Sequence, residues 1–265
     1  MSRLHEVFAA ARTDRRAALV AYLPAGFPSV PGAIEALRAM VAAGVDIVEI
    51  GVPYSDPVLD GPTIQAATGQ ALAAGTTMTD VLATVEAVAA TGAPTVVMSY
   101  WNPLEQYGLD AFARDLAARG GAGVITPDLT PEEAADWTVA TDSRGVDRVY
   151  LVALSSTAAR LATVTAACSG FVYAGAVMGV TGARSQLGSG VADLVTRTRE
   201  VTDLPVAVGL GVSTAAQAAT VAGYADGVIV GSAFVRCLLD APTAAAGIDA
   251  AAALAAELAA GVRRR

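Results

Sequence analysis

Short apolar runs rich in β-branched residues alternate with alanine-rich helical stretches along the whole 265-residue chain. The runs are almost continuously apolar, as expected for parallel strands that are covered on both faces. We expect eight strands, at Ala18–Leu23, Asp46–Gly51, Thr95–Tyr100, Gly123–Thr126, Arg148–Leu154, Gly170–Ala176, Pro205–Val208 and Asp226–Val230. Helical patterns lie between them, for example at Val30–Ala43, Leu109–Ala118, Pro131–Ala140 and Thr214–Ala222.

This alternation predicts the α/β class and a closed barrel, because strand–helix units with right-handed crossovers close naturally on themselves. We expect a single (β/α)8 TIM-barrel domain over residues 1–265, with an extra N-terminal helix at 1–16 and long loops after strands 2 and 6. A doubly wound open sheet is the competing architecture. It would usually need fewer strands and a glycine-rich first turn, and the first turn here, Pro24-Ala25-Gly26-Phe27-Pro28, is not a dinucleotide fingerprint.

The composition excludes several kinds of chemistry. The sequence has no lysine, which excludes a Schiff-base aldolase or a pyridoxal-phosphate enzyme. His5 is the only histidine, so neither a histidine triad nor a histidine metal cluster can be built. The formal charge of −8 argues against a nucleic-acid partner, because nothing would offset phosphate repulsion. We therefore expect no cofactor or metal, and acid–base work done by carboxylates or tyrosines.

The sequence also indicates where the chain resides. Cys168 and Cys237 are the only cysteines and form neither a disulfide framework nor a zinc spacing, which fits a reducing compartment. The leading segment Met1–Arg16 is charged and has no apolar signal core. The uncharged stretch Leu161–Ala183 has few bulky apolar side chains, so we interpret it as a helix end and a buried strand rather than a membrane span. A cytoplasmic protein without membrane contact is predicted.

Two loops are longer than their connections require. The segment Val52–Pro62, after strand 2, is rich in proline, aspartate and glycine, and the segment 177–190, after strand 6, is rich in glycine. In a barrel of this type, functional groups lie at the carboxyl ends of strands and in the loops that follow. Long loops there are often lids or binding elements, and we expect 177–190 to be a flexible lid.

Glycines follow strands 7 and 8, in Gly209-Leu210-Gly211 and Gly231-Ser232-Ala233. Such turns let backbone N–H groups and a helix N-terminus approach an anion, and the Ser232 hydroxyl would add a donor. Gly182, in the loop after strand 6, could complete this cradle. The alternative is that these glycines only make tight turns. Two such turns at consecutive strand ends favour a phosphate site.

Two carboxylates mark the opposite end of the predicted site. Glu49 lies inside an apolar strand, where a buried charge is costly, and its position could direct it into the barrel mouth with a raised pKa. The alternative for Glu49 is a structural partner. Asp60, before Gly61-Pro62, and Asp56, before Pro57, could each be ordinary turn or cap residues. Because Asp60 closes the loop that begins beside Glu49, both carboxylates can face one cavity and divide acid and base roles.

These residues form a recognisable signature. The segment Glu49-Ile50-Gly51-Val52-Pro53-Tyr54-Ser55-Asp56-Pro57, followed by Asp60-Gly61-Pro62-Thr63-Ile64-Gln65, resembles the tryptophan synthase alpha chain family. Further matches occur in the same order across essentially the whole chain, at Tyr22-Leu23-Pro24-Ala25-Gly26, Met98-Ser99-Tyr100-Trp101-Asn102-Pro103, Pro127-Asp128-Leu129, Met178-Gly179-Val180-Thr181-Gly182-Ala183 and Gly209-Leu210-Gly211.

The resemblance implies a carbon–carbon lyase that cleaves indole-3-glycerol phosphate to indole and glyceraldehyde 3-phosphate. It implies that Glu49 protonates indole C3 and removes the side-chain hydroxyl proton, while Asp60 holds and deprotonates the indole N–H. Thr181 would be the lid threonine that packs against the catalytic aspartate. The remaining implied substrate-binding residues are Tyr22, Leu23 and Leu129 near the indole pocket, Tyr173 in the active site, and Gly182, Gly211, Gly231 and Ser232 around the phosphate.

The family also works as an α2β2 complex, so the resemblance implies a beta subunit partner that carries pyridoxal phosphate and receives the indole. Asp56 and Pro57 match the segment that contacts this partner. Leu154, Val177 and Thr130 depart from patterns common in the family, and Val177 could alter lid closure. Two alternatives remain open: a free-standing indole-releasing lyase, and an idle barrel that only activates the beta subunit.

Overall fold

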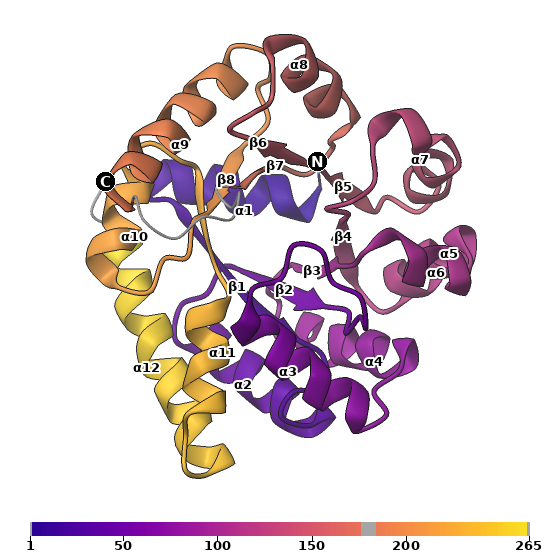
Figure 1. Cartoon of the computed structure of the whole chain (residues 1–265), viewed down its shortest axis with the longest axis vertical. Helices are drawn as coiled ribbons and strands as arrows, with labels where there is room; N and C mark the ends of the chain where they lie inside the picture. Colours follow the sequence, from indigo (N-terminus) through magenta and orange to yellow (C-terminus); the bar gives the residue numbers. More distant parts are fainter. Residues whose placement is uncertain (1, 176–183, 264–265) are drawn as a thin grey trace.

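Parallel strands form a closed barrel at the centre of the molecule (Figure 1). The computed structural model describes residues 2–175 and 184–263, with side chains at 2–175 and 190–263. The strands are β1 (Ala18–Pro24), β2 (Ile47–Gly51), β3 (Thr95–Met98), β4 (Gly121–Ile125), β5 (Asp147–Val149), β6 (Leu151–Ala153), β7 (Val172–Gly175), β8 (Val206–Gly209) and β9 (Gly227–Val230). Their order in the sheet is β5-β4-β3-β2-β1-β9-β8-β7-β6. Since β5 and β6 follow one another in the chain, the two ends of the sheet meet and the barrel closes.

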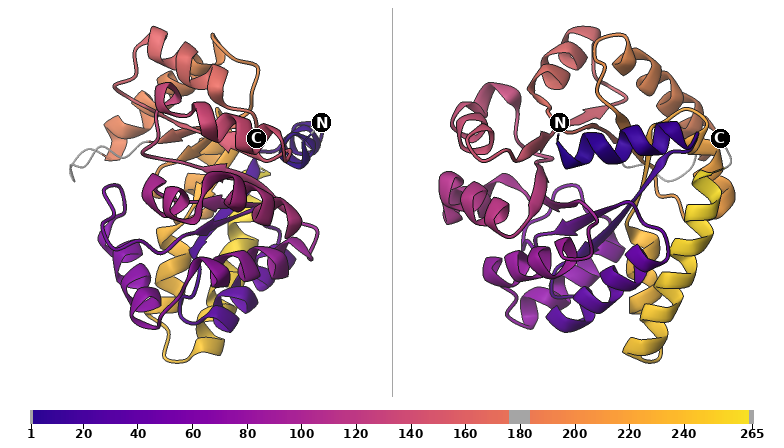
Figure 2. Two further views of the ribbon diagram at one scale, coloured as in Figure 1. Left: turned by 90° about the vertical axis from the view of Figure 1, so that its right-hand side faces the viewer. Right: turned by 180° about the vertical axis from the view of Figure 1, so that it is seen from behind.

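Helices surround the strands, as both views in Figure 2 show. They are α1 (Arg3–Thr13), α2 (Val30–Ala42), α3 (Pro62–Ala73), α4 (Met78–Ala89), α5 (Trp101–Tyr107), α6 (Leu109–Ala118), the 3-10 turn η1 (Pro131–Glu133), α7 (Ala135–Asp142), α8 (Ala158–Ala167), α9 (Arg184–Arg199), α10 (Ala215–Ala222), α11 (Ser232–Leu239) and α12 (Ala244–Val262). Among the described helices, α12 alone is long and apolar enough for a membrane span. It packs against α2, α10 and α11, so it serves the barrel as a covering helix.

All eight predicted strands are present, and the fifth is divided in two. The division falls at Tyr150, whose N–H donates to the Cys168 sulfur at 3.4 Å instead of to a neighbouring strand. Its carbonyl oxygen accepts the Tyr173 N–H at 3.2 Å, which keeps the barrel wall continuous. The β-bridge pattern is therefore interrupted for one residue, and β5 pairs with β4 while β6 pairs with β7.

Two predicted boundaries need correction. The loop predicted over 177–190 is shorter, because α9 begins at Arg184 and its residues 184–190 are helical. Buried Val191, Leu194 and Val195 anchor this helix to the barrel, and its two glycines do not prevent the helix from starting earlier than expected. The helix predicted over Pro131–Ala140 is broken between η1 and α7, where Ala134 has φ −96° and ψ 15° and leaves the helical conformation.

The predicted N-terminal helix is confirmed as α1, and it closes the amino end of the barrel. In the right-hand view of Figure 2, seen from behind, α1 lies across this end. Leu4 and Phe8 are buried there, and the Phe8 and Phe171 ring centroids are 5.5 Å apart. Leu4 and Phe8 belong to one buried cluster with side chains that point into the barrel from alternate positions of the strands, such as Val20 and Ile47. With this end filled, a cavity in the barrel can open only at the carboxyl ends of the strands.

Candidate active site

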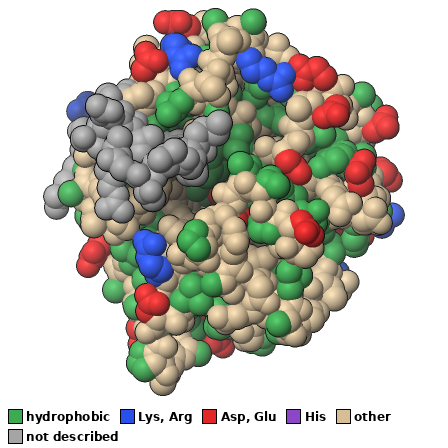
Figure 3. Space-filling model, viewed as in Figure 1, with side chains coloured by type: hydrophobic (Ala, Val, Ile, Leu, Met, Phe, Trp, Pro, Cys, Tyr) green, Lys and Arg blue, Asp and Glu red, His purple; other side chains and the backbone are tan. Residues whose placement is uncertain are grey.

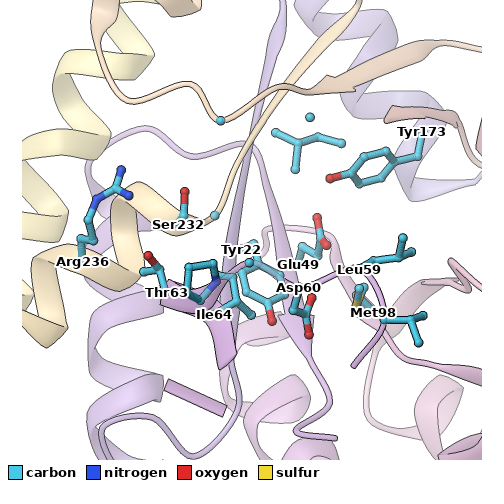
Figure 4. Close-up of a pocket in the computed structure, with 17 residues that line it drawn as sticks. Tyr22, Glu49, Leu59, Asp60, Thr63, Ile64, Met98, Tyr173, Ser232 and Arg236 are labelled. Carbon is cyan, nitrogen blue, oxygen red and sulfur yellow. The ribbon is translucent and has the colours of Figure 1, made fainter. Parts of the chain in front are cut away.

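A cavity of about 760 Å³ opens at the carboxyl ends of the strands. Figure 3 shows a hollow bordered by hydrophobic side chains near the centre of this face. The cavity lies between the ends of β1, β2, β3, β7, β8 and β9 and the starts of α3 and α11. Figure 4 shows two groups of side chains in it: Glu49 and Asp60 at one end, and Ser232 and Arg236 at the other.

Glu49 points into this cavity from β2, as the sequence pattern predicted. Strand alternation places it on the same face as Ile47, and the β1–β2 register sets it beside Tyr22. Its side chain is only 3% exposed, and its Oε2 atom has no hydrogen-bond partner among the described residues. Burial, with a smaller contribution from the charge of Asp60, raises the pKa of Glu49 to about 8. The structural partner that would have explained Glu49 otherwise is not found in the described part of the chain.

Asp60 faces Glu49 from the loop between β2 and α3 (Figure 4). Asp60 does not cap the following helix. The N-cap of α3 is Gly61, and no side chain forms a capping hydrogen bond at this helix start. Burial raises the pKa of Asp60, whereas a hydrogen bond from the Tyr100 hydroxyl lowers it. The two carboxylates thus share one cavity but differ in environment, which is how such pairs divide acid and base roles.

Tyr100 supports the loop that carries Asp60. Its side chain is 2% exposed, and the Leu59 N–H donates to its hydroxyl oxygen at 2.9 Å. The Tyr54 ring packs on it, with centroids 5.2 Å apart. Tyr100 is the N-cap of α5, and the next residue, Trp101, donates its N–H to the Asp128 carboxylate at 2.9 Å. The loop position of Asp60 is therefore tied to the wall of the barrel.

A smaller recess of about 140 Å³ continues from the carboxylates into the barrel. Its walls include Met98, Ile125 and Leu151, whereas Glu49 and Asp60 supply its charged side chains. The recess is enclosed by apolar atoms on most sides and therefore suits the aromatic part of a ligand.

Two tyrosines line the cavity between its ends. Tyr22 lies over Gly51 and Tyr173 over Gly209 so closely that a methyl group on either glycine would overlap the tyrosine hydroxyl. Burial raises the pKa of both tyrosines, and the charges of Glu49 and Asp60 raise them further, so both remain neutral donors.

The opposite end of the cavity is built from backbone. Gly211 has φ +66°, a left-handed conformation that favours glycine, and leaves open space where a side chain would stand. Helix α11 begins at Ser232 with Gly231 as its N-cap, and no side chain caps its first N–H groups. These free N–H groups and the positive end of the helix dipole are suited to an anion.

The structure separates some residues that the sequence grouped together. Leu23 is fully buried on the face of β1 opposite to Tyr22 and does not line the cavity, and Leu129, also buried, does not line it either. Thr181 and Gly182, like Val177, lie outside the described residues. The assignment of Leu23 to the indole pocket overlooked strand alternation, since neighbours on a strand face opposite sides.

Asp56 and Pro57 lie on the outer edge of the Asp60 loop. Asp56 is exposed and accepts a hydrogen bond from the Ser55 hydroxyl at 2.6 Å. The next two side chains are unusually exposed for their size, Val58 at 76% and Leu59 at 43%. Both side chains also line the main cavity, so the loop presents apolar side chains at the rim of the cavity and to solvent directly before Asp60.

The two other departures from the family pattern have local roles. Leu154 packs beside Gly190 of α9. The Thr130 hydroxyl donates to the Glu133 carboxylate at 2.9 Å and closes the turn η1. Neither residue lines the cavity.

Sequence reasoning missed Met98, Tyr100 and Arg236 as site residues. Met98 and Tyr100 stand at the end of the predicted strand Thr95–Tyr100, which was a usable signal. Arg236 stands four residues after Ser232, one turn along a helix, which was a weaker signal. Among the described residues, no group of three or more His, Cys, Asp and Glu side chains could hold a metal ion.

A closed (β/α)8 barrel with a buried, protonatable glutamate facing a second carboxylate defines a protein of the barrel class whose site is suited to acid–base chemistry. A family model described as the tryptophan synthase alpha chain matches residues 8–263. The alpha chain of Salinispora arenicola is 62% identical over 99% of this chain and 98% of its own length, and that of Thermobifida fusca is 58% identical over the same shares. The chain belongs to the tryptophan synthase alpha chain family.

Solved structures agree with this family and with the fold. A structure of Mycobacterium tuberculosis tryptophan synthase has a TM-score of 0.92 and 55% identity, covering 99% of this chain and 98% of that one. The alpha subunit of Legionella pneumophila has a TM-score of 0.89 at 31% identity, with the same coverage. The barrel is thus retained at much lower sequence identity.

Proposed function

We propose that this chain cleaves indole-3-glycerol phosphate by a retro-aldol reaction into indole and glyceraldehyde 3-phosphate, as the lyase step of tryptophan biosynthesis. The observation that carries the proposal is Glu49: a buried carboxyl group, with a pKa of about 8 and an unpartnered oxygen, that faces Asp60 across a cavity. A group with this pKa is protonated at neutral pH and can both donate and accept a proton.

The chemistry assigns two proton transfers to Glu49. It first donates its proton to C3 of the indole, which turns the ring into a good leaving group. The side-chain hydroxyl then loses its proton to the Glu49 carboxylate, the electron pair of the broken O–H bond forms the second bond of the aldehyde C=O, and the C–C bond breaks with its electrons passing to the ring. Asp60 accepts the hydrogen bond of the ring N–H and stabilises the positive charge that develops there. Glu49 ends protonated, ready for the next turnover.

The substrate's two ends match the two ends of the cavity. The apolar recess beside Met98 and Ile125 would hold the ring near the carboxylates. Gly211, Gly231 and Ser232 would hold the phosphate through backbone N–H groups, and Tyr22 and Tyr173 would lie along the substrate between them. Thr181 and Gly182 would complete the lid and the cradle.

We further propose that the chain acts in the cytoplasm and assembles with a beta subunit as an α2β2 complex, to which it passes indole. Pyridoxal phosphate would belong to that partner alone. The Asp56–Leu59 segment supports this proposal, because Val58 and Leu59 expose apolar side chains beside Asp56 and Pro57. Exposed apolar surface of this kind is common at protein–protein contacts.

The substitution Glu49→Gln tests the reaction. We expect it to reduce indole release by at least about 10² to 10⁴-fold, because one group serves as both acid and base. Retention of more than about a tenth of the wild-type rate would overturn the assignment of Glu49. The exposed Glu35→Gln, on α2, is the matched control and should leave the rate unchanged.

The same assay, run with and without a beta subunit, tests the assembly. Stimulation by the beta subunit supports the complex. A rate that saturating beta subunit leaves unchanged would instead identify a free-standing lyase. Binding of glycerol 3-phosphate with no indole release under either condition would identify an idle barrel.

A further inference from the structure

Arg236 is the only cationic side chain among the described residues that line the main cavity. The other two charged groups in this lining are Glu49 and Asp60, both acidic. The whole chain carries a formal charge of −8. A phosphorylated substrate would therefore enter an acidic molecule through a cavity whose described lining has one positive group.

The position of Arg236 follows from helix geometry. It stands four residues after Ser232 on α11, so the two side chains lie on one face of the helix, with about 5–6 Å between their Cβ atoms. In Figure 4 the Ser232 hydroxyl and the Arg236 guanidinium point the same way from α11, at the end of the cavity away from the carboxylates.

Arg236 is also free to bind a ligand. The ion pairs of the described residues join other arginines to carboxylates, and none of them involves Arg236. Asp240, the C-cap of α11, lies four residues further along the chain and borders a second pocket together with Arg236, but no ion pair joins the two in the described structure. Arg236 itself is exposed, so its charge is directed to solvent at the edge of the cavity.

We propose that Arg236 binds the substrate's phosphate dianion and thereby orients the substrate, with its phosphate toward α11 and its ring toward the carboxylates. This inference rests on the proposed function, since it takes a phosphorylated substrate as given. The backbone N–H groups at the start of α11 fix the site of the phosphate, and the guanidinium adds the charge that a neutral backbone lacks. The same charge opposes binding in the reversed orientation, which would bring the phosphate against Glu49 and Asp60.

The test is Arg236→Gln, with Arg236→Lys as the charge-retaining variant and Arg114→Gln as the control. Arg114 is an exposed arginine on α6, outside the cavity, whose removal changes the net charge equally. We expect Arg236→Gln to raise the KM for indole-3-glycerol phosphate by about 5- to 20-fold and to change kcat by less than about twofold, because a partly exposed charge-assisted contact is lost from ground and transition states alike. Arg236→Lys should recover most of the loss, and Arg114→Gln should show none.

A second substrate separates this role from a structural one. The dephosphorylated analogue, indole-3-glycerol, should have the same KM with wild type and with Arg236→Gln. The KM for the phosphorylated substrate should also rise more steeply with salt in the wild type than in the variant. A KM within about twofold of wild type, or an equal rise for both substrates, would overturn the proposal.

Failure of the proposed function has a different result. In that case the wild type would release no indole from either substrate. Titration of wild type and Arg236→Gln with glycerol 3-phosphate, followed by calorimetry, would then decide the role of Arg236 independently of turnover. Weaker binding by the variant supports it, and equal binding or no binding to either protein contradicts it.

Discussion

The Tyr100 hydroxyl acts on Asp60 in two ways. Burial raises the pKa of Asp60, and the hydrogen bond from Tyr100 acts against this. The same hydroxyl accepts the Leu59 N–H at 2.9 Å, so it also fixes the backbone directly before Asp60. Tyr100 is thus a positioning residue: it opposes the effect of burial on the pKa of Asp60 and fixes the backbone beside it.

Replacing Tyr100 by phenylalanine keeps the ring and removes the hydroxyl. Without its hydrogen bond the pKa of Asp60 rises, so we expect the acid limb of the kcat/KM profile to move to higher pH by up to about one unit. At neutral pH the rate should fall by about 3- to 10-fold. Tyr107→Phe is the control, since the Tyr107 hydroxyl donates to the Asp115 carboxylate at 2.8 Å outside the main cavity. A Tyr100→Phe profile that matched the control would contradict the role.

At the scale of single residues, the sequence predicted some site residues more directly than others. Glu49 could be predicted from its pattern alone, because an ionisable side chain inside an apolar strand requires an explanation. Asp60 looked like a turn residue, and only the surrounding motif pointed to it. The contact between Tyr100 and the Asp60 loop joins residues 41 positions apart, so it arises from tertiary packing that local sequence does not encode.

At the scale of the elements, the turn between β8 and α10 contains a glycine for which another connection of the chain offers a matched control. Gly211 has φ +66° and Gly145 has φ +65°, and neither has an atom within 4 Å of the position a Cβ would take. Gly211 lines the cavity, whereas Gly145 lies in the connection from α7 to β5 and does not. The two glycines have the same backbone strain in different places.

Alanine at either position should reduce the free energy of unfolding by about 1 kcal/mol, because a Cβ disfavours this conformation. Only Gly211→Ala should raise the KM for indole-3-glycerol phosphate, since in the proposed function its backbone approaches the phosphate. Urea unfolding and steady-state kinetics on both variants measure the two effects. An equal rise in KM for Gly145→Ala would show that general destabilisation, and not the phosphate contact, is responsible.

The eight strands were predictable because buried parallel strands are continuous apolar runs. The break at Tyr150 was not, since it depends on the Cys168 sulfur that replaces a strand partner. The helical start of α9 at Arg184 was also missed, because glycines in the sequence indicated a loop whereas packing of the following turns supports a helix.

At the scale of the whole molecule, Glu49 imposes a pH dependence on folding. The pKa of Glu49 rises from its ordinary value of 4.5 to about 8 in the folded state. Between these values the folded protein holds a proton that the unfolded chain has lost, so the free energy of unfolding falls as pH rises. This cost is absent below about pH 4.5 and complete above about pH 8.

Glu49→Gln removes this dependence. Its unfolding free energy, relative to that of wild type, should increase by about 2–4 kcal/mol between pH 5 and pH 8. Urea unfolding at both pH values measures the difference, and Glu35→Gln, an exposed glutamate on α2, should track wild type throughout. A Glu49→Gln difference that stays constant with pH would mean that Glu49 titrates normally in the folded chain.

The exposed pair Val58 and Leu59 has a thermodynamic consequence. The Leu59 amide is held by the Tyr100 hydroxyl, which also lowers the pKa of Asp60 against the effect of burial. A protein that rests on these two side chains would therefore act on the proposed catalytic carboxylate through a single residue. Linkage between two sites is reciprocal: if covering this surface changes substrate affinity by some factor, bound substrate must change the affinity of the covering protein by the same factor. The affinity of the covering protein would then depend on whether substrate fills the cavity.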